Sequence, residues 1–337
     1  MTANRWVKII LLRGIMQFEY PNVLAPAKCS NTVSACCESL SGECQRTRLE
    51  TDVNAMPDRD ESLIFLHIPK TGGSTVYKIL DRQYSRAQTL RLEEDSQIAA
   101  FKTFPVAKRG RHRLIEGHLH FGLHRFIPRA STYITFLRKP VERVLSFYYY
   151  ARSTPDHYLY PLLSAERLDL KMLFARELTS ELCNGQTRQV AGDEWEDPHR
   201  AVTRAALERA QANLRTHFRV VGILEEFDAS LLLLRRAFDW HLPFYVKENV
   251  TKEKPADMSQ DDETRRLIKD ANALDLELYE YACGLFEEQC CAAGDSFAAD
   301  LCEFRRLNDA YARSVPRFTG SFRRLFRWTQ NSLGFAG

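Results

Sequence analysis

Residues 62–78, SLIFLHIPKTGGSTVYK, constrain the fold of this chain more than any other stretch. Residues 63–68 form a short apolar run of mainly β-branched and aromatic side chains, and a proline and two glycines follow directly. This pattern is typical of a buried central strand of a parallel sheet that ends in a turn. Ser74 or Thr75 can cap a helix after the turn. The stretch therefore predicts a strand, a turn and a helix in immediate succession.

The predicted turn has the chemistry of an anion-binding loop. Unpaired N–H groups in the first turn of a helix attract anions, and the adjacent Gly72 and Gly73 let the backbone approach phosphate oxygens closely. Lys70 supplies a mobile positive charge at the entrance of the loop. Further hydrogen-bond donors come from the hydroxyls of Thr71, Ser74 and Thr75. We predict that this loop binds a phosphate group; the alternative is a tight turn that holds no ligand.

The order of residues in the loop separates it from the Walker A motif. A Walker A loop requires G-x-x-x-x-G-K-[ST], whereas here the lysine precedes two adjacent glycines. The sequence H-I-P-K-T-G-G-S-T resembles the 5′-phosphosulfate loop of sulfotransferases that use 3′-phosphoadenosine 5′-phosphosulfate (PAPS). It is close to the form found in the carbohydrate sulfotransferase family that includes heparan sulfate 2-O-sulfotransferase. The resemblance implies that residues 70–75 bind PAPS and that Lys70 also takes part in catalysis.

A second motif follows the strand predicted at residues 131–137, STYITFL. The pattern R-x-P-x-x-R-x-x-S-x-Y resembles the 3′-phosphate-binding motif of the same enzymes, and its residues here are Arg138, Pro140, Arg143, Ser146 and Tyr148. An arginine at a strand end can hold a phosphate with its planar fork, and a proline suits the first turn of the next helix. The resemblance implies that Arg138 and Ser146 bind the 3′-phosphate. The alternative is that the two arginines are solvated charges and the serine has no role.

Three histidines, at 118, 120 and 124, follow a strand predicted at residues 113–119. Their H-x-H-x-x-x-H spacing, without nearby cysteines or carboxylates, favours a zinc site only weakly. The sequence G-H-x-x-F-G looks like the segment that carries the catalytic base in the carbohydrate sulfotransferases, which implies that His118 is the base. An imidazole suits this role because it can accept a hydroxyl proton near neutral pH. His120 and His124 have no such match, and we expect them to be packing or substrate-edge residues.

The remaining pattern predicts the fold class and the domains. Residues 218–224, FRVVGIL, read as a further strand, and the predicted strands alternate with helices. The sequence therefore predicts an α/β, P-loop-like, three-layer fold with a central parallel sheet flanked by helices. We predict a sulfotransferase domain at residues 61–292, preceded by a poorly structured extension at 1–60. A C-terminal helix and a basic aromatic tail are predicted at 293–337.

The predicted function is transfer of a sulfuryl group from PAPS to a hydroxyl of an acceptor, expected to be a carbohydrate. Adenosine 3′,5′-bisphosphate is the other product, and no metal is expected. One alternative is a nucleotide-dependent kinase, but the Walker A loop is missing and two strands end in Arg138 and Glu225 instead of aspartate. Another is a non-catalytic relative that binds a nucleotide or a glycan. That alternative predicts the loss of Lys70 or His118, and both are present.

Three further segments have two interpretations each. Residues 184–188, NGQTR, resemble a recurrent stretch in bacterial members of the family, and they either line the acceptor site or form a capped turn. Lys252 and Lys254 either clamp phosphate or are solvated. The tail at 313–337 carries five arginines among aromatic residues. It is compatible with peripheral contact with an anionic membrane or a sulfated glycan, or with a disordered or packing extension.

Composition adds limits on partners and location. The 47 basic and 44 acidic residues give a net charge of only +3, which provides no case for binding nucleic acid. The nine cysteines would form disulfides in a lumenal protein and remain thiols in a cytosolic one. No run approaches the roughly 20 apolar residues of a transmembrane helix. Golgi members of the resembled family carry an N-terminal membrane anchor. Because no such apolar segment is found in this sequence, the sequence predicts a cytoplasmic location. The alternative is the Golgi, if the N-terminus is incomplete or the source is eukaryotic.

Overall fold

The computed structural model describes residues 61–332 except 167, 177–178, 193–200 and 247–260, and the side chains of the last helix only as far as residue 314. The described chain is built on one five-stranded sheet in the order β2-β3-β1-β4-β5, and all four strand pairings are parallel. Its strands are β1 (Ser62–Leu66), β2 (Thr89–Leu92), β3 (Leu114–Gly117), β4 (Ser131–Leu137) and β5 (Phe218–Ile223). The predicted α/β class with a central parallel sheet is confirmed.

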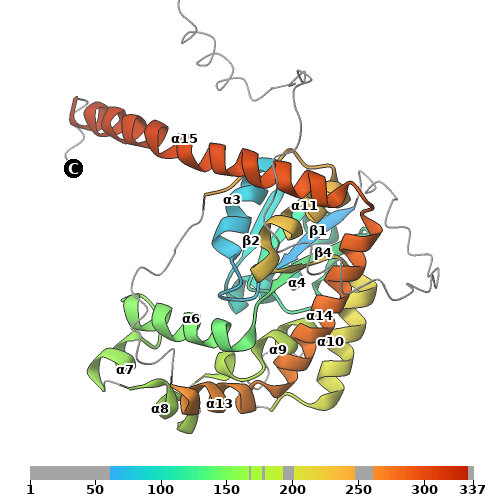
Figure 1. Cartoon of the computed structure of the whole chain (residues 1–337), viewed down its shortest axis with the longest axis vertical. Coiled ribbons are helices and arrows are strands. Elements are labelled where there is room, and N and C mark those ends of the chain that lie inside the picture. The colour runs from blue at the N-terminus through green and yellow to red at the C-terminus, as the bar shows by residue number, and fades with distance from the viewer. Residues whose placement is uncertain (1–60, 167, 177–178, 193–200, 247–260, 333–337) are drawn as a thin grey trace, which may run out of the picture. The chain divides into compact units, whose positions relative to one another are not determined.

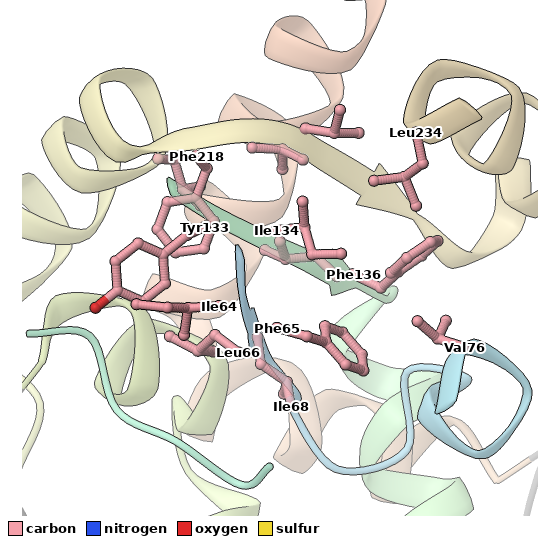
Figure 2. Packing of buried hydrophobic residues seen from close by; sticks show 14 of the residues in the cluster. Ile64, Phe65, Leu66, Ile68, Val76, Tyr133, Ile134, Phe136, Phe218 and Leu234 are labelled. Atoms are coloured by element: carbon pink, nitrogen blue, oxygen red, sulfur yellow. The ribbon is translucent and has the colours of Figure 1, made fainter. Parts of the chain in front are cut away.

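Strand β1 lies at the centre of the sheet, between β3 and β4. Its side chains are buried on both faces, which explains why the sequence is a continuous apolar run without alternation. Figure 2 shows Ile64, Phe65 and Leu66 packed against aromatic and aliphatic side chains of β4. This buried core fixes the end of β1 and therefore the start of the loop that follows it.

Helices cover the sheet and fill the connections between the strands (Figure 1). The first part of the chain contributes α3 (Gly73–Gln83), α4 (Asp95–Thr103), α5 (Val106–Arg109) and the 3₁₀ helix η1 (Leu123–Phe126). The connection from β4 to β5 contains α6 (Pro140–Ser153), α7 (Tyr160–Ala165), α8 (Leu170–Ala175), η2 (Ser180–Leu182), α9 (Gly185–Ala191) and α10 (Arg204–His217). After β5 come η3 (Leu224–Glu226), α11 (Phe227–Phe238), α13 (Asp262–Ala271), α14 (Ala273–Ala292) and α15 (Phe297–Ser332).

A second, smaller core forms where α6, α7, α8 and α13 pack together, at the bottom of Figure 1. Each of these four helices contributes buried side chains to it, among them Val144, Leu163, Leu170 and Ile268. Helix α6 begins with Pro140 in its first turn, as predicted, directly after β4. The second core therefore holds α6, the helix that carries Ser146, against α7, α8 and α13.

Two local features differ from the sequence prediction. Strand β2 was not predicted, because it is short and only one of its four residues, Leu92, is buried, so it has no apolar run. Helix α3 begins at Gly73 and not after a Ser74 or Thr75 cap, because its N-cap is Gly72 in the left-handed region at φ 91°. A left-handed N-cap favours glycine, which has no Cβ to clash with the backbone.

The C-terminal segment is helical from Phe297 to Ser332, so of the interpretations of the tail a disordered extension does not fit residues 313–332. None of the described helices is both long enough and apolar enough to cross a membrane. The predicted extension at 1–60 and the loop with Lys252 and Lys254 lie outside the described residues.

Candidate active site

The carboxyl ends of the parallel strands meet at one edge of the sheet, and an open cleft of about 1450 Å³ lies there. A ligand site at this edge is the general expectation for open parallel α/β sheets. The cleft is lined by every predicted site residue except Thr71: Lys70, Gly72, Gly73, Ser74, Thr75, His118, Arg138 and Ser146. The structure thus brings together residues that the sequence separates by more than 70 positions.

The loop after β1 is closed by its own side chain. Thr71 is fully buried, and its hydroxyl donates a hydrogen bond to the carbonyl oxygen of Ile68 at 2.8 Å. This hydroxyl therefore holds the turn and does not face the cleft, unlike the expectation that it binds the ligand. Lys70, at φ 71°, is a non-glycine residue in the left-handed region. Such strain persists where the surrounding structure enforces it, often at ligand sites.

The two adjacent glycines are required by close packing above the loop. A Cβ on Gly72 would lie 2.7 Å from Cδ1 of Leu224, and one on Gly73 would lie 1.9 Å from Nε2 of His67. Real Cβ contacts are never this short, so larger residues would displace these neighbours. The glycines let the amino-terminal turn of α3, whose first N–H groups have no intrahelical acceptor, lie against the cleft.

The lysine of the first motif contacts the arginine of the second. Nη1 of Arg138 donates a hydrogen bond to the carbonyl oxygen of Lys70 at 3.1 Å, across 68 residues of sequence. The ammonium of Lys70 lies 3.7 Å from the ring centroid of Tyr150 on α6. Burial, and then the nearby Arg138, lower the pKa of Lys70 to about 8. Two cations at such close range make the centre of the cleft a site for an anion.

Arg138 is half-buried and fixed through its backbone. Its N–H donates to Oε1 of Gln186 at 3.0 Å, and Nε2 of Gln186 donates to its carbonyl oxygen at 3.0 Å. The next N–H, of Lys139, donates to Oε1 of Glu225 at 3.1 Å. Burial lowers the pKa of Arg138, which is therefore not a solvated surface charge. Ser146, two turns along α6, also lines the cleft.

Arg143 is buried in the interior of the protein. Its side chain is 1% exposed, and Nη2 donates to the carbonyl oxygen of Glu181 at 2.7 Å. The same Nη2 lies 3.8 Å from Oδ2 of Asp275 on α14. The alternative that Arg143 is a solvated charge is wrong, because the side chain ties α6 to α14 in the interior.

The N-G-Q-T-R segment forms the start of α9 and supports the second motif. Asn184 is its N-cap, in the left-handed region at φ 49°. The backbone N–H groups of Gln186 and Thr187 donate to Asp275 at 3.1 and 2.7 Å. Arg188 lines the cleft. The sequence did not show that this segment supports the backbone of Arg138, because nothing in the sequence connects Gln186 to Arg138.

His118 lies beside a second histidine at the ends of two paired strands. Leu66 of β1 pairs with Gly117 of β3, so the next residues, His67 and His118, are neighbours. Their ring centroids are 4.8 Å apart. Burial lowers the pKa of His118, and the carboxylate of Glu93 partly opposes this shift. His118 is therefore neutral and able to accept a proton near pH 7. His67 was missed in the sequence because it lies within an apolar run.

The other two histidines do not line the cleft. Nδ1 of His124 is 2.9 Å from the hydroxyl of Tyr133, and its ring lies 5.2 Å from that of His217. His124 is thus a packing residue, as expected. Within the described residues no group of three or more histidine, cysteine or acidic side chains is arranged to hold a metal ion.

Acidic side chains gather where β2 ends. Glu93, Glu94 and Asp95 line the cleft after this strand. Arg91 on β2 pairs with Glu116 on β3. Oε1 of Glu116 accepts hydrogen bonds from Nε of Arg91 at 2.8 Å and from Nη2 of Arg91 at 2.6 Å. Burial raises the pKa of Glu116 to about 7, while Arg91 acts in the opposite direction. Carboxylates therefore outnumber cations on this side of the cleft, where Arg91 is paired with Glu116 and Asp81.

Comparison with known proteins identifies the family. A family model described as Galactose-3-O-sulfotransferase matches residues 15–318. The chain belongs to the galactose-3-O-sulfotransferase family. This confirms the resemblance to carbohydrate sulfotransferases that use PAPS.

Individual relatives agree with this assignment. Mouse galactose-3-O-sulfotransferase 3 is 30% identical over 280 residues, which are 77% of this chain and 63% of that protein. Human uronyl 2-sulfotransferase is 30% identical over 184 residues, which are 47% of this chain and 40% of that protein. A solved structure, mouse sulfotransferase SULT7A1 complexed with PAP, covers 67% of this chain and 69% of that chain with 11% identity and a TM-score of 0.33, too low to establish a shared fold. The chain thus spans less than two thirds of the galactose-3-O-sulfotransferase that it matches.

The prediction of a cytoplasmic location is wrong. The galactose-3-O-sulfotransferases and uronyl 2-sulfotransferase among the relatives are Golgi enzymes, and they point to a Golgi location instead. The prediction depended on the absence of an apolar anchor in the sequence, and that absence does not determine the compartment.

Proposed function

We propose that this protein is a PAPS-dependent sulfotransferase that transfers a sulfuryl group to a sugar hydroxyl. One observation carries the proposal: the hydrogen bond of 3.1 Å from Arg138 to the carbonyl of Lys70 joins the two nucleotide motifs in one cleft. His118 lies in the same cleft, two strands away from Arg138. The family of the chain supports the same reaction class.

Each motif would bind one end of the donor. The loop at residues 70–75 faces the 5′-phosphosulfate with the first turn of α3 and the ammonium of Lys70. Arg138 and Ser146 bind the 3′-phosphate, and they select PAPS over ATP because only PAPS carries that group. The rigid support of Arg138 by Gln186 and of the next residue by Glu225 keeps this site in place before the ligand arrives.

The reaction is an in-line displacement at sulfur. The acceptor oxygen forms a bond to sulfur, and the bond between sulfur and the bridging phosphate oxygen breaks. The electron pair of that bond stays on the bridging oxygen, and adenosine 3′,5′-bisphosphate leaves. The acceptor proton moves to the imidazole of His118, while Lys70 and the loop N–H groups stabilise charge on the bridging oxygen.

The charge of the cleft favours a neutral sugar as the acceptor. The names of the relatives include both galactose and uronyl acceptors. The carboxylates of Glu93, Glu94 and Asp95 line the cleft on the side of His118, and Arg91 is already engaged by Glu116. A uronate carboxylate would be repelled there, whereas carboxylates accept hydrogen bonds from neutral sugar hydroxyls. We therefore propose galactose as the acceptor.

Calorimetric titration with adenosine 3′,5′-bisphosphate, adenosine 5′-monophosphate and ATP tests the donor site. We expect the bisphosphate to bind the wild type most tightly and Arg138→Ala to lose this preference. Arg86→Ala, which removes an exposed arginine outside the cleft, is the matched control and should bind as the wild type does. Equal or tighter binding of ATP to the wild type would contradict the proposal.

Sulfuryl transfer from PAPS to a β-galactoside and to a glucuronide tests the acceptor. We expect transfer to the galactoside, little transfer to the glucuronide, and a loss of about 10² to 10⁴ in kcat for His118→Ala, the usual contribution of a general base. Preference for the glucuronide would show that the acidic side of the cleft does not select the acceptor.

A further inference from the structure

His67 has three neighbours that surround the reaction centre. Its ring centroid is 4.8 Å from that of His118, the proposed base. Its Nδ1 lies 3.0 Å from the hydroxyl of Tyr77 on α3. Its Nε2 occupies the space directly above Gly73, where a Cβ would lie only 1.9 Å away. One buried imidazole, 7% exposed, therefore separates the donor loop from the base.

The contact with Tyr77 is compatible with a tautomer of this imidazole that carries its proton on Nε2. Burial raises the pKa of Tyr77, so the phenol keeps its O–H. That hydroxyl lies within hydrogen-bond distance of Nδ1 of His67. If the hydroxyl donates to Nδ1, then Nδ1 is the acceptor and the proton of the neutral ring is on Nε2. In that tautomer the N–H lies on the side of Gly73.

The surroundings of His67 keep it neutral. Burial lowers its pKa well below the usual value, and the nearby His118, Lys70 and Arg91 lower it further. His118 follows the end of β3, Lys70 belongs to the donor loop and Arg91 lies on β2. A neutral donor at this place does not compete with His118 for the acceptor proton.

We propose that His67 is a catalytic residue whose Nε2–H donates a hydrogen bond to an oxygen of the transferring sulfuryl group, with Tyr77 as the positioning residue that fixes its tautomer. This inference rests on the proposed function. The sulfuryl group must pass between the donor loop and the acceptor hydroxyl held at His118, and the ring of His67 lies between them. His67 keeps its proton throughout, since the acceptor proton goes to His118 and the bridging oxygen receives the electron pair.

Steady-state kinetics with PAPS and a galactoside, combined with bisphosphate titration, test this role. The bisphosphate lacks the sulfuryl group, so it reports the donor loop without the proposed hydrogen bond. For His67→Phe we expect kcat to fall by about 10²-fold, as for loss of one oxyanion donor, while the bisphosphate Kd changes less than about threefold. His67→Gln keeps an amide donor and should recover part of kcat. Tyr77→Phe should lower kcat by about 10-fold by releasing the tautomer.

The pH profile separates the two histidines. In His67→Gln the fall of kcat/KM at acidic pH should persist, because His118 still titrates as the base. Loss of that acidic fall would make His67 the base and overturn the proposal. A bisphosphate Kd that rises in parallel with the loss of kcat would reduce His67 to a support of the donor loop. An unchanged kcat would show that it has no role.

Two further measurements keep these outcomes distinct. His241→Phe is the matched control, because His241 is exposed and outside the cleft, and it should leave kcat unchanged. A wild type that binds no bisphosphate and transfers no sulfuryl group would overturn the proposed function itself. If the wild type binds the bisphosphate and transfers the sulfuryl group, and a folded His67→Phe or His67→Gln variant keeps full activity, only the role of His67 is overturned.

Discussion

Gln186 holds the backbone of Arg138 with both ends of its side-chain amide. The N–H of Arg138 donates to Oε1 and its carbonyl oxygen accepts from Nε2, each at 3.0 Å. Gln186 is fully buried on α9, 48 residues further along the chain. The geometry of the proposed 3′-phosphate site therefore depends on a side chain that does not itself line the cleft.

Replacement of Gln186 by alanine should weaken nucleotide binding without removing a ligand contact. We expect the bisphosphate Kd to rise about tenfold, and the free energy of unfolding to fall by about 1–3 kcal/mol because two buried backbone groups lose their partners. Calorimetry and thermal unfolding measure the two effects. Gln211→Ala on α10, outside the cleft, is the control. Wild-type bisphosphate affinity in Gln186→Ala would show that Arg138 does not need this support.

The pH profile of the wild type should reflect the buried position of His118. A base acts when it is neutral, so kcat/KM rises with pH through the pKa of the free enzyme's base. Burial lowers the pKa of His118 below 6.5, so the acidic midpoint should lie below pH 6.5. Since the carboxylate of Glu93 raises this pKa, Glu93→Gln should move the midpoint to lower pH. Asp95→Asn is the control, and a midpoint that moves equally in both variants would contradict the assignment.

The basic side of the same profile should report Lys70. Its pKa is lowered to about 8, so the free enzyme loses this positive charge as the pH rises through that value. We expect kcat/KM to fall above about pH 8. Lys70→Arg keeps the charge at higher pH, because guanidinium does not titrate in this range, so its lower activity should no longer decline there. A decline at the same pH in Lys70→Arg would assign it to another group.

Arg143 should matter for stability more than for phosphate binding, although it belongs to the second sequence motif. Its removal leaves the buried Asp275 without the nearest cation, and breaking a buried pair costs about 3–5 kcal/mol. Thermal unfolding of Arg143→Met should show a loss of this order. Arg152→Met on the exposed side of the same helix should change stability by less than about 0.5 kcal/mol. Equal stability of the two variants would place Arg143 outside the structural framework.

The sequence was most informative where function depends on contiguous residues. Residues 62–78 form the predicted strand, loop and helix, and β4 has the predicted bounds. These elements are readable because a buried central strand is a long apolar run and glycine marks a turn. Strand β2 is partly exposed, and Arg91 interrupts its apolar pattern, so its existence depends on pairing with β3.

The parts of the site that the sequence did not show depend on tertiary contacts. His67 faces His118 only because Leu66 pairs with Gly117, a register that appears once both strands are in the sheet. Gln186 reaches Arg138 only because α9 packs beneath the end of β4. Motif patterns specify residues that meet the ligand, whereas the residues that hold them are specified by packing.

Gly73 provides the most direct test of the packing between the donor loop and His67. A Cβ at this position would lie 1.9 Å from Nε2 of the imidazole, so Gly73→Ala must displace the ring or the loop. We expect the alanine to lower kcat by at least about tenfold and to reduce stability by about 1–3 kcal/mol, the usual cost of overpacking. Gly284→Ala, at a helical position with open space around it, should be neutral or stabilise by up to about 1 kcal/mol.

A double-mutant cycle decides whether the clash with His67 is the cause. In a His67→Ala background the added methyl group has room, so Gly73→Ala should cost less stability and less bisphosphate affinity than it does in the wild type. The difference is the coupling energy between the two residues, and contacting residues show couplings of about 0.5–3 kcal/mol. Thermal unfolding and bisphosphate titration of the four proteins measure it. Strictly additive effects would mean that the ring does not rest on Gly73, and they would remove the geometric basis for placing Nε2 of His67 at the donor loop.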